Sequence, residues 1–248
     1  MNTLHSSLQS GNTQVGTFVK IPSPIIMEVL ALSGLDFVIL DAEHAPFDRG
    51  SLDQCIMTCR LSNLPTLVRV ENTLPSTLLN ALDCGASGLQ IPHVKSAAQA
   101  EELVKLCRYG HGGRGYAGST RAANYGGTGI KEHLENNVEP LIVAQIEDPE
   151  GVDDIDAIAA VEGISALFIG RVDLTVAYNE TDQNANRVLQ ACHKICQAAK
   201  KHNKPVGIFL PNESQVTQWQ EAGVSFFGIS SEHNMIKEGF QRLVSKSK

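Results

Sequence analysis

The chain alternates short apolar runs with longer segments of helical character. The runs are apolar throughout rather than alternating, as expected of parallel strands that are covered on both faces. They span 15–19, 36–40, 65–70, 87–91, 140–146, 165–170, 205–209 and 224–229. The segments predicted to be helical span 22–33, 48–61, 75–84, 96–108, 149–160, 183–202, 213–222 and 232–245. Eight strand–helix repeats favour a (β/α)8 barrel, or TIM barrel, over an open doubly wound sheet.

Glycines and one irregular segment support this interpretation. Four glycines stand just past a predicted helix, where a left-handed residue is usually needed: Gly34, Gly85, Gly163 and Gly223. Residues 109–138 are rich in glycine and are predicted to form a long loop with a short helix. Loops of that length are unusual unless they have a function. No break in composition marks a second domain, so residues 1–248 are expected to form a single domain.

Composition and charge narrow the class of protein. The 248 residues are 42% hydrophobic, and no apolar run reaches the ~18–20 residues of a membrane span. The start, MNTLHSSLQSGN, lacks the basic head and apolar stretch of a signal peptide. A net charge of −7 with scattered basic residues argues against a nucleic-acid partner. Six cysteines without a CxxC pattern indicate free thiols, so we expect a cytoplasmic protein with no membrane partner.

Polar side chains follow several of the predicted strands. In a barrel of this kind the active site forms at the carboxyl ends of the strands, which we call the mouth. The candidates there are Asp41, Glu43, His44, Arg69, Gln90, His93, Gln145, Glu147 and Asp173. Ionisable groups from five strands would converge on one small mouth, where unpaired charge is costly. A divalent cation would resolve that cost.

The residue types fit such a site. Glu147 and Asp173, together with water, match a Mg²⁺ or Mn²⁺ site that leaves room for substrate oxygens. Arg69 can donate to a carboxylate or to a developing oxyanion. His44, oriented by Asp41, is predicted to transfer protons near neutral pH. Covalent catalysis through a Schiff base (an imine) would need a buried lysine at a strand end, but acids stand there instead. The sequence therefore favours catalysis with a metal ion over catalysis through a Schiff base.

Each residue also has a purely structural interpretation. Arg69 could pair with a structural acid inside the barrel. Glu147 could cap the helix that follows it, because acids favour helix N-termini. Asp173 could cap a short turn, and His93 is expected to be solvated in its loop. The joint occurrence of these groups at five strand ends favours a reaction centre.

The order and spacing of six motifs resemble the HpcH/HpaI class II aldolases, of the 2,4-dihydroxyhept-2-ene-1,7-dioate and 2-keto-3-deoxy acid aldolase type. The motifs are LDAEHAPFD (40–48), LVRVE (67–71), LDCGASGLQIPHV (82–94), RYGHGGRGYAGSTRAANYG (108–126), QIEDPEGVDDIDAIAAVEGI (145–164) and FIGRVDLT (168–175). The resemblance covers most of the chain. It implies a TIM barrel whose last helix swaps between subunits of a homohexamer, a trimer of dimers. It also implies a lyase that reversibly cleaves a 4-hydroxy-2-keto acid to pyruvate and an aldehyde through a metal-stabilised pyruvate enolate.

The resemblance further implies the metal site and the residues around pyruvate. Glu147 and Asp173 would ligate a divalent cation, Mg²⁺ in the first place and Mn²⁺ or Co²⁺ as alternatives. Arg69 would hold the keto oxygen, and Gln145 would line the site. The backbone amides of Val172 and Asp173 would hold the pyruvate carboxylate.

Proton transfer and subunit contacts are implied in the same way. His44 with Asp41 would form the acid/base dyad. Asp83 would reach the dyad of a neighbouring subunit.

The sequence departs from the family pattern at two strand ends. Arg171 and Val172 replace the usual proline and alanine, and we expect added positive charge near the carboxylate site and added bulk beside the pyruvate methyl. Glu232 and His233 stand at the eighth strand end. Two alternatives therefore stay open. One is an oxaloacetate decarboxylase or a citrate-synthase-like condensing enzyme, and the other is a non-catalytic keto-acid sensor.

Overall fold

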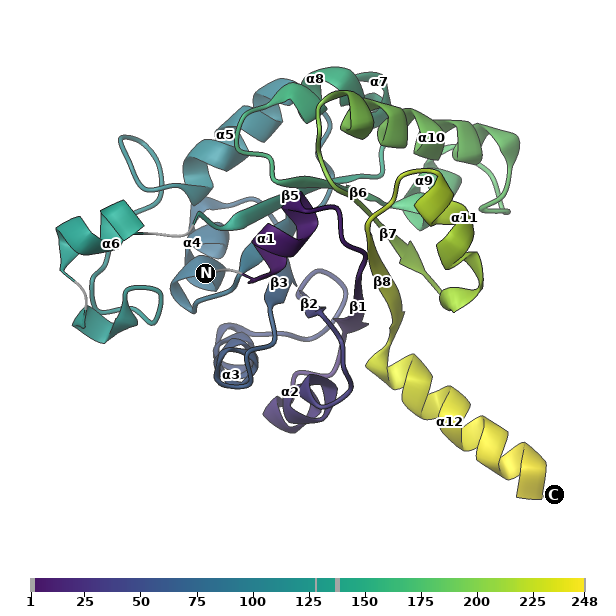
Figure 1. Ribbon diagram of the computed structural model, residues 1–248, viewed down its shortest axis with the longest axis horizontal. Helices are drawn as coiled ribbons and strands as arrows, with labels where there is room; N and C mark the ends of the chain where they lie inside the picture. Colours follow the sequence, from purple (N-terminus) through teal and green to yellow (C-terminus); the bar gives the residue numbers. More distant parts are fainter. Residues whose placement is uncertain (1–2, 128, 137–138, 248) are drawn as a thin grey trace.

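The computed structural model describes residues 3–127, 129–136 and 139–247 (Figure 1). Within these residues eight parallel strands form a closed barrel in the order β1 to β8. The strands are β1 Gln14–Val19, β2 Phe37–Asp41, β3 Thr66–Arg69, β4 Gly88–Ile91, β5 Leu141–Ile146, β6 Ala166–Ile169, β7 Val206–Leu210 and β8 Phe226–Ser231. Each predicted apolar run overlaps one strand, so the predicted TIM barrel is confirmed.

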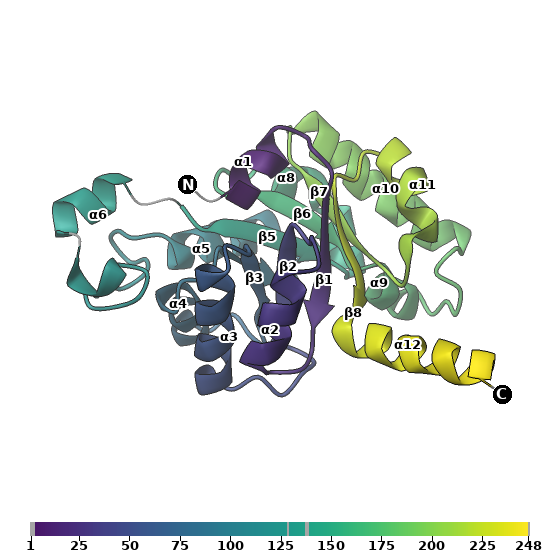
Figure 2. The same cartoon turned by 60° about the horizontal axis from the view of Figure 1, so that its bottom comes forward.

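Helices surround the barrel on its outside (Figures 1 and 2). They are α2 Pro24–Ala31, α3 Arg49–Leu61, α4 Pro75–Asp83, α5 Ala97–Cys107, α7 Pro149–Asp153, α8 Ile155–Ala160, α10 Asn186–Lys201, the 3-10 helix η2 Glu213–Gln215 and α11 Val216–Glu221. The last helix, α12 Glu232–Ser247, follows β8. The Asp48 side chain caps α3 by accepting the Ser51 N–H at 2.7 Å. The helix predicted over 149–160 is divided at Asp154, which ends α7 and precedes α8.

The segment between α5 and β5 contains the predicted short helix. This is α6, Ile130–Asn136, preceded by the 3-10 turn η1, Asn124–Gly126. The segment extends away from the barrel, at the left of Figure 1. Positions 128, 137 and 138 of the predicted loop lie outside the described residues.

Two helices were not predicted. Helix α1, Thr3–Gln9, places Leu4 and Leu8 in the cluster of apolar side chains inside the barrel. Helix α9, Arg171–Ala177, follows β6 directly. It carries Asp173 in its first turn, so the structure replaces the predicted short turn with a helix at the mouth.

The core has an inner and an outer layer. The inner layer fills the barrel with aromatic rings that meet edge to face, among them Phe18 and Phe168, whose ring centres lie 6.1 Å apart. The outer layer packs the other strand faces against the helices. Both faces of each strand are thus covered, which explains why the strands read as continuous apolar runs.

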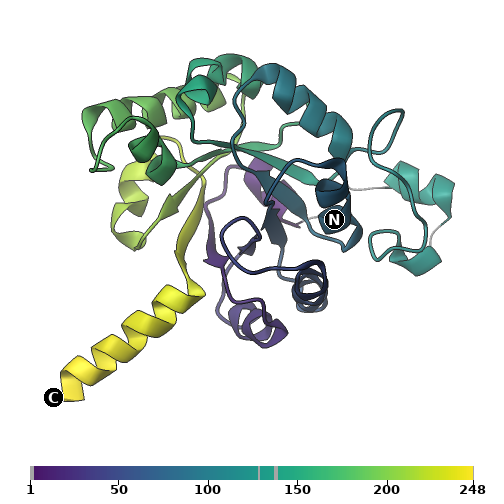
Figure 3. The same ribbon diagram turned by 180° about the vertical axis from the view of Figure 1, so that it is seen from behind.

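Helix α12 leaves the barrel instead of packing on it (Figures 1, 2 and 3). Among its described residues Glu232 is the buried one. Its exposed apolar side chains are Met235, Ile236, Phe240, Leu243 and Val244. No helix within the described residues is long and apolar enough to cross a membrane.

Candidate active site

Strand register brings four polar residues to one level of the barrel. Asp41 pairs with Arg69, and Arg69 pairs with Gln90. On the other side of β2, Val19 pairs with Leu40, so Lys20 follows β1 at the level of Asp41. Paired residues of parallel strands point to the same face of the sheet. Lys20, Asp41, Arg69 and Gln90 therefore meet at the mouth.

Asp41 is the centre of a charged cluster. It is fully buried, and the Arg69 guanidinium contacts both of its carboxylate oxygens, with Nε 2.9 Å from Oδ1 and Nη2 2.8 Å from Oδ2. The Lys20 ammonium lies 2.6 Å from Oδ2. Burial raises the pKa of Asp41, but the hydrogen bonds and charges of Arg69 and Lys20 outweigh it and hold the pKa below its usual value. Asp41 is therefore an ionised carboxylate, and the structural pairing considered for Arg69 does occur.

His44 lies at the mouth beside Asp41, as the sequence predicts, but it contacts Asp41 through its backbone. Its backbone N–H donates to Asp41 Oδ1 at 3.2 Å, while its ring Nε2 lies 3.6 Å from Glu43 Oε2. Arg69 and Lys20 occupy the Asp41 oxygens, so the recorded contact between Asp41 and His44 is the backbone one. The acid/base dyad of His44 and Asp41 stays a prediction. The His44 ring is more than half exposed and faces Glu43 at the mouth.

Glu147 is a buried carboxylate at the end of β5. Oε1 accepts the backbone N–H of His93 at 2.9 Å, and Oε2 accepts from the amide of Gln145, which itself accepts from Gln90. Burial, with the nearby charge of Asp173, raises the pKa of Glu147 to about 6. Glu147 does not cap α7, because Asp148 occupies the N-cap position.

Gly170 makes room for Glu147. A Cβ on Gly170 would lie 2.4 Å from Glu147 Cβ and 2.7 Å from its Oε2. Gly170 is also the N-cap of α9, whose first turn contains Val172 and Asp173. Backbone N–H groups in a first turn have no intrahelical acceptor. Adjacent strands β5 and β6 thus bring a buried acid, a second acid and free amides to one side of the mouth.

This donor set fits a hard divalent cation. Two carboxylates of like charge lie close enough for one to raise the pKa of the other, and a cation between them removes that repulsion. No group of three or more His, Cys, Asp or Glu within the described part of the chain is arranged to hold a metal. Water and substrate oxygens would therefore have to complete the coordination shell, as is usual for Mg²⁺. Oxygen-only ligands also favour Mg²⁺ or Mn²⁺ over softer metals.

Comparison with known proteins identifies the relatives of this site. Residues 14–237 match the family described as HpcH/HpaI aldolase/citrate lyase. The chain belongs to this family. It is 34% identical to 5-keto-4-deoxy-D-glucarate aldolase of Klebsiella pneumoniae over 249 residues, which cover 100% of this chain and 97% of that protein. The family and this full-length likeness make the chain a pyruvate aldolase, that is, a carbon–carbon lyase.

Solved structures agree with the family assignment. A HpcH/HpaI aldolase/citrate lyase family protein from Burkholderia cenocepacia superposes with a TM-score of 0.94 at 28% identity, covering 100% of this chain and 99% of that one. The citrate synthase SbnG superposes with a TM-score of 0.88 at 28% identity, covering 100% and 98%. Both likenesses extend over the whole barrel.

Arg171, at which this HpcH/HpaI member departs from the family pattern, contacts the segments that follow β6 and β7. The Arg171 side chain is buried, with Nε 3.0 Å from Gln183 Oε1 and Nη2 3.0 Å from Gln215 Oε1. Its guanidinium lies 5.5 Å above the ring of Trp219, which belongs to the outer core layer. These contacts hold the guanidinium against Gln183, Gln215 and Trp219, and the expected positive charge near the carboxylate site stays a prediction. Val172 is exposed.

Glu232 and His233 follow the end of β8, as the sequence predicts. Glu232 is buried and accepts the backbone N–H of Lys20 at 2.7 Å and that of Ile21. It therefore holds the loop after β1. His233 is exposed.

Lys20 is a mouth residue that the sequence analysis missed, whereas His93 was among its candidates. The prediction that the strand ends lack a suitable lysine overlooked Lys20, which directly follows an apolar strand. The His93 side chain is exposed, as expected of a residue solvated in its loop, and it also has carboxylate partners: Nδ1 lies 2.8 Å from Asp148 Oδ2 and Nε2 lies 3.7 Å from Glu43 Oε1. Its backbone is left-handed, with φ of 55°. For Lys20 the available signal was a polar residue at a strand end.

Asp83 lies away from this cluster, at the end of α4. It forms an ion pair with Arg114, whose guanidinium lies 4.6 Å from the ring centre of Tyr109. The contact therefore ties α4 to the segment after α5. The contact of Asp83 with a neighbouring subunit stays a prediction.

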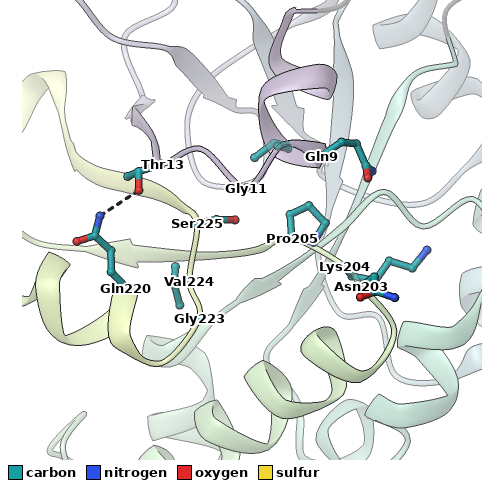
Figure 4. Close-up of a pocket in the computed structure, with 11 residues that line it drawn as sticks. Gln9, Gly11, Thr13, Asn203, Lys204, Pro205, Gln220, Gly223, Val224 and Ser225 are labelled. Atoms are coloured by element: carbon teal, nitrogen blue, oxygen red, sulfur yellow. Dashed lines mark hydrogen bonds between the residues drawn. The ribbon is translucent and has the colours of Figure 1, made fainter.

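A cavity of about 490 Å³ lies at the opposite end of the barrel (Figure 4). Gly11, Thr13, Pro205 and Ser225 line it, and all four precede their strands. The residues of this end usually serve stability in a TIM barrel. The mouth, not this cavity, is the candidate active site.

Proposed function

We propose that this protein is a divalent-metal-dependent aldolase that reversibly cleaves a 4-hydroxy-2-keto acid to pyruvate and an aldehyde. The supporting observation is the position of Glu147, a buried carboxylate beside Asp173 at the same mouth as the Asp41–Arg69 pair. Buried acids with displaced pKa values are typical of functional sites.

The proposal gives each residue around pyruvate a role. Glu147 and Asp173 would hold Mg²⁺, with Mn²⁺ or Co²⁺ as alternatives, which would supply Lewis-acid chemistry toward the keto acid. Arg69 uses Nε and Nη2 on Asp41, so the remaining N–H groups of its guanidinium hold the keto oxygen. The amides of Val172 and Asp173 hold the carboxylate, and Gln145 lines the site. Negative charge that develops on the enolate thus meets fixed donors.

Cleavage also requires proton transfer. A base must take the proton of the 4-hydroxyl group, and an acid must return a proton to the carbon that becomes the pyruvate methyl. His44 is assigned to this transfer because its ring is exposed at the mouth next to Glu43. Asp41 supports it by binding the His44 backbone and by orienting Arg69.

The first substrate to test follows from the aldolase relatives. The name 5-keto-4-deoxy-D-glucarate describes a keto carbon beside a carboxylate, then a methylene, then a hydroxyl-bearing carbon. Cleavage after the methylene releases pyruvate and an aldehyde that carries a carboxylate. We infer a substrate of this class for the present chain.

Metal removal and ligand variants test the proposal. Pyruvate release from 5-keto-4-deoxy-D-glucarate is followed with a coupled dehydrogenase, before and after chelation and after addition of Mg²⁺. Chelation should abolish release, and Glu147→Gln and Arg69→Ala should each reduce kcat at least about 100-fold. Lys201→Met, which removes an exposed ion pair with Asp156, should leave kcat unchanged. Full activity after complete metal removal contradicts the metal assignment.

A second candidate keeps the enolate and changes its source. The likeness to a citrate synthase favours oxaloacetate as substrate, either decarboxylated or condensed with an activated acyl group. Assays with oxaloacetate, with and without acetyl-CoA, separate this candidate from the first. No consumption of oxaloacetate removes it.

The assembly inferred for this cytoplasmic enzyme is a homohexamer, a trimer of dimers, with residues 1–248 as one catalytic domain. Support comes from α12, which presents an apolar side away from its own barrel. Helix α2 leaves Ile25, Val29 and Leu32 exposed. Large exposed apolar patches mark interaction sites. We therefore propose that α12 docks on a neighbouring copy.

A further inference from the structure

Lys20 is a charged residue of the mouth to which the proposed chemistry gives no role. It lies at the level of Asp41 because Val19 pairs with Leu40. Its ammonium is 2.6 Å from Asp41 Oδ2, the same oxygen that lies 2.8 Å from Arg69 Nη2. One carboxylate oxygen thus serves two cations.

We propose that Lys20 is a positioning residue of the aldolase reaction, which acts on Arg69 through Asp41, and that Glu232 fixes Lys20 in place. The proposal rests on the proposed function, because the group that benefits is the guanidinium that binds the keto oxygen.

The charges of the cluster explain the effect. With Lys20 present, the negative charge of Asp41 is shared between two cations, and Arg69 keeps positive charge for the developing enolate. Without Lys20, Arg69 would be the remaining cationic partner of Asp41 among the described residues, and the carboxylate would cancel more of the Arg69 charge. Asp41 is fully buried and the Arg69 side chain is 10% exposed, so solvent screens this interaction little.

The ion pair between Lys20 and Asp41 differs from a surface ion pair because it is more buried. Lys201 lies 2.8 Å from Asp156, at a similar distance, but both side chains are about 60% exposed. Exposed pairs contribute little, whereas loss of one partner of a buried charge is costly. The Lys20 side chain is 28% exposed, and its partner is inaccessible.

The backbone around Lys20 is held by the start of α12. Glu232 Oε1 accepts the N–H of Lys20 at 2.7 Å and that of Ile21. Nearby, Thr17 Oγ1 donates to the carbonyl of Ile229 at 2.8 Å. A continuous series of contacts therefore runs from Glu232 to Lys20 and Asp41. It ends at Arg69 and connects the projecting helix with the reaction centre.

The test compares Lys20→Met and Lys20→Arg with Lys201→Met as matched control. The first readout is exchange of the pyruvate methyl protons in D2O with Mg²⁺ present, followed by NMR. The second is the dissociation constant of oxalate, a planar mimic of the enolate, against that of pyruvate. Lys20→Met should slow exchange about 10- to 100-fold, as is usual when an outer partner of a functional group is removed. It should weaken the binding of oxalate by a similar factor and the binding of pyruvate by less than about twofold. The reason is that the lost positive charge matters most where negative charge develops on the ligand.

The conservative variant and the control complete the design. Lys20→Arg should recover most of the exchange rate, and Lys201→Met should match the wild type. Exchange by Lys20→Met at the wild-type rate overturns the proposal. An equal loss of oxalate and pyruvate affinity also overturns it, because Lys20 would then bind the substrate directly. If the wild type itself exchanges no protons, the proposed function fails. The oxalate and pyruvate dissociation constants of Lys20→Met still test the role of Lys20 in that case.

Glu232 is tested with the same readouts. Glu232→Gln keeps an oxygen that accepts both N–H groups and should retain most of the exchange rate. Glu232→Ala removes it and should reproduce the loss seen for Lys20→Met. Wild-type exchange by Glu232→Ala overturns the role of Glu232.

Discussion

Substituting Gly170 by alanine tests whether the space beside Glu147 is required. The backbone of Gly170 has φ of −85°, which alanine adopts without strain, so the cost comes from contact alone. The added Cβ would lie 2.4 Å from Glu147 Cβ. Carbon atoms pack best at about 3.5–4.0 Å, so Glu147 or α9 must move by about 1 Å. Overpacking of this kind costs about 1–3 kcal/mol.

The movement should affect both stability and chemistry. For a chain of this size each kcal/mol lowers the melting temperature by about 2–4 °C, so a fall of about 2–12 °C is expected. Glu147 also loses its alignment with Gln145 and the His93 N–H. A misplacement of about 1 Å in a reaction centre can reduce the rate about 100-fold. Mg²⁺ affinity should fall as well, because Glu147 is the buried ligand of the proposed site.

Calorimetry measures both quantities on the same samples. Scanning calorimetry gives the melting temperature, and titration gives the Mg²⁺ dissociation constant in the presence of oxalate. Gly50→Ala is the control, because a Cβ there meets nothing closer than 3.6 Å and Gly50 lies in the first turn of α3. It should leave Mg²⁺ affinity unchanged and raise stability by up to about 1 kcal/mol. Gly170→Ala with a lower melting temperature but normal Mg²⁺ affinity would refute Glu147 as a ligand.

Three further predictions concern charge, orientation and assembly. The pKa of Asp41 is lowered on folding, so it contributes stability above pH 3.8 that is lost as the pH falls through the folded value. Asp41→Asn should remove that acid-side loss and cost about 3 kcal/mol at pH 7; an unchanged pH profile of unfolding would contradict this. Arg171→Met should lower stability by about 1–3 kcal/mol and leave the KM for the keto acid unchanged, since Arg171 faces Gln183 and Gln215; a raised KM would return it to the substrate side. Ending the chain after Ser231 should yield a smaller species in light scattering, and a persisting hexamer would contradict the role of α12.

The barrel could be predicted from the sequence because its strands are buried on both faces and read as continuous apolar runs. Helices α1 and α9 could not. Residues 3–9 contain two leucines among polar residues, which is too weak a pattern to predict a helix. The helix is stabilised by the contact of Leu4 and Leu8 with the inner core, which the sequence does not show. The seven residues of α9 are too few to show a periodic pattern.

Part of the candidate site could likewise be predicted from the sequence, and part could not. That Asp41, Arg69, Glu147 and Asp173 stand at strand ends follows from the order of the chain. Which of them touch does not, because contact depends on strand register and on the direction of each side chain. Asp41 is the clearest case: only two residues separate it from His44, yet its charged partners come from β3 and from the residue after β1.

Register also explains why the strand at 37–41 can end in an acid. An isolated carboxylate without solvent contact would be protonated or would destabilise the fold. Here β2 lies between β1 and β3, and the pairings Val19 with Leu40 and Asp41 with Arg69 bring one cation from each neighbour. Shifting either neighbour by one residue would turn its cation to the other face of the sheet and leave Asp41 with a single partner. The charge balance of the proposed reaction centre therefore depends on the same pairings that close the barrel, so a substitution that shifts the register of β1 should impair Arg69 without touching it.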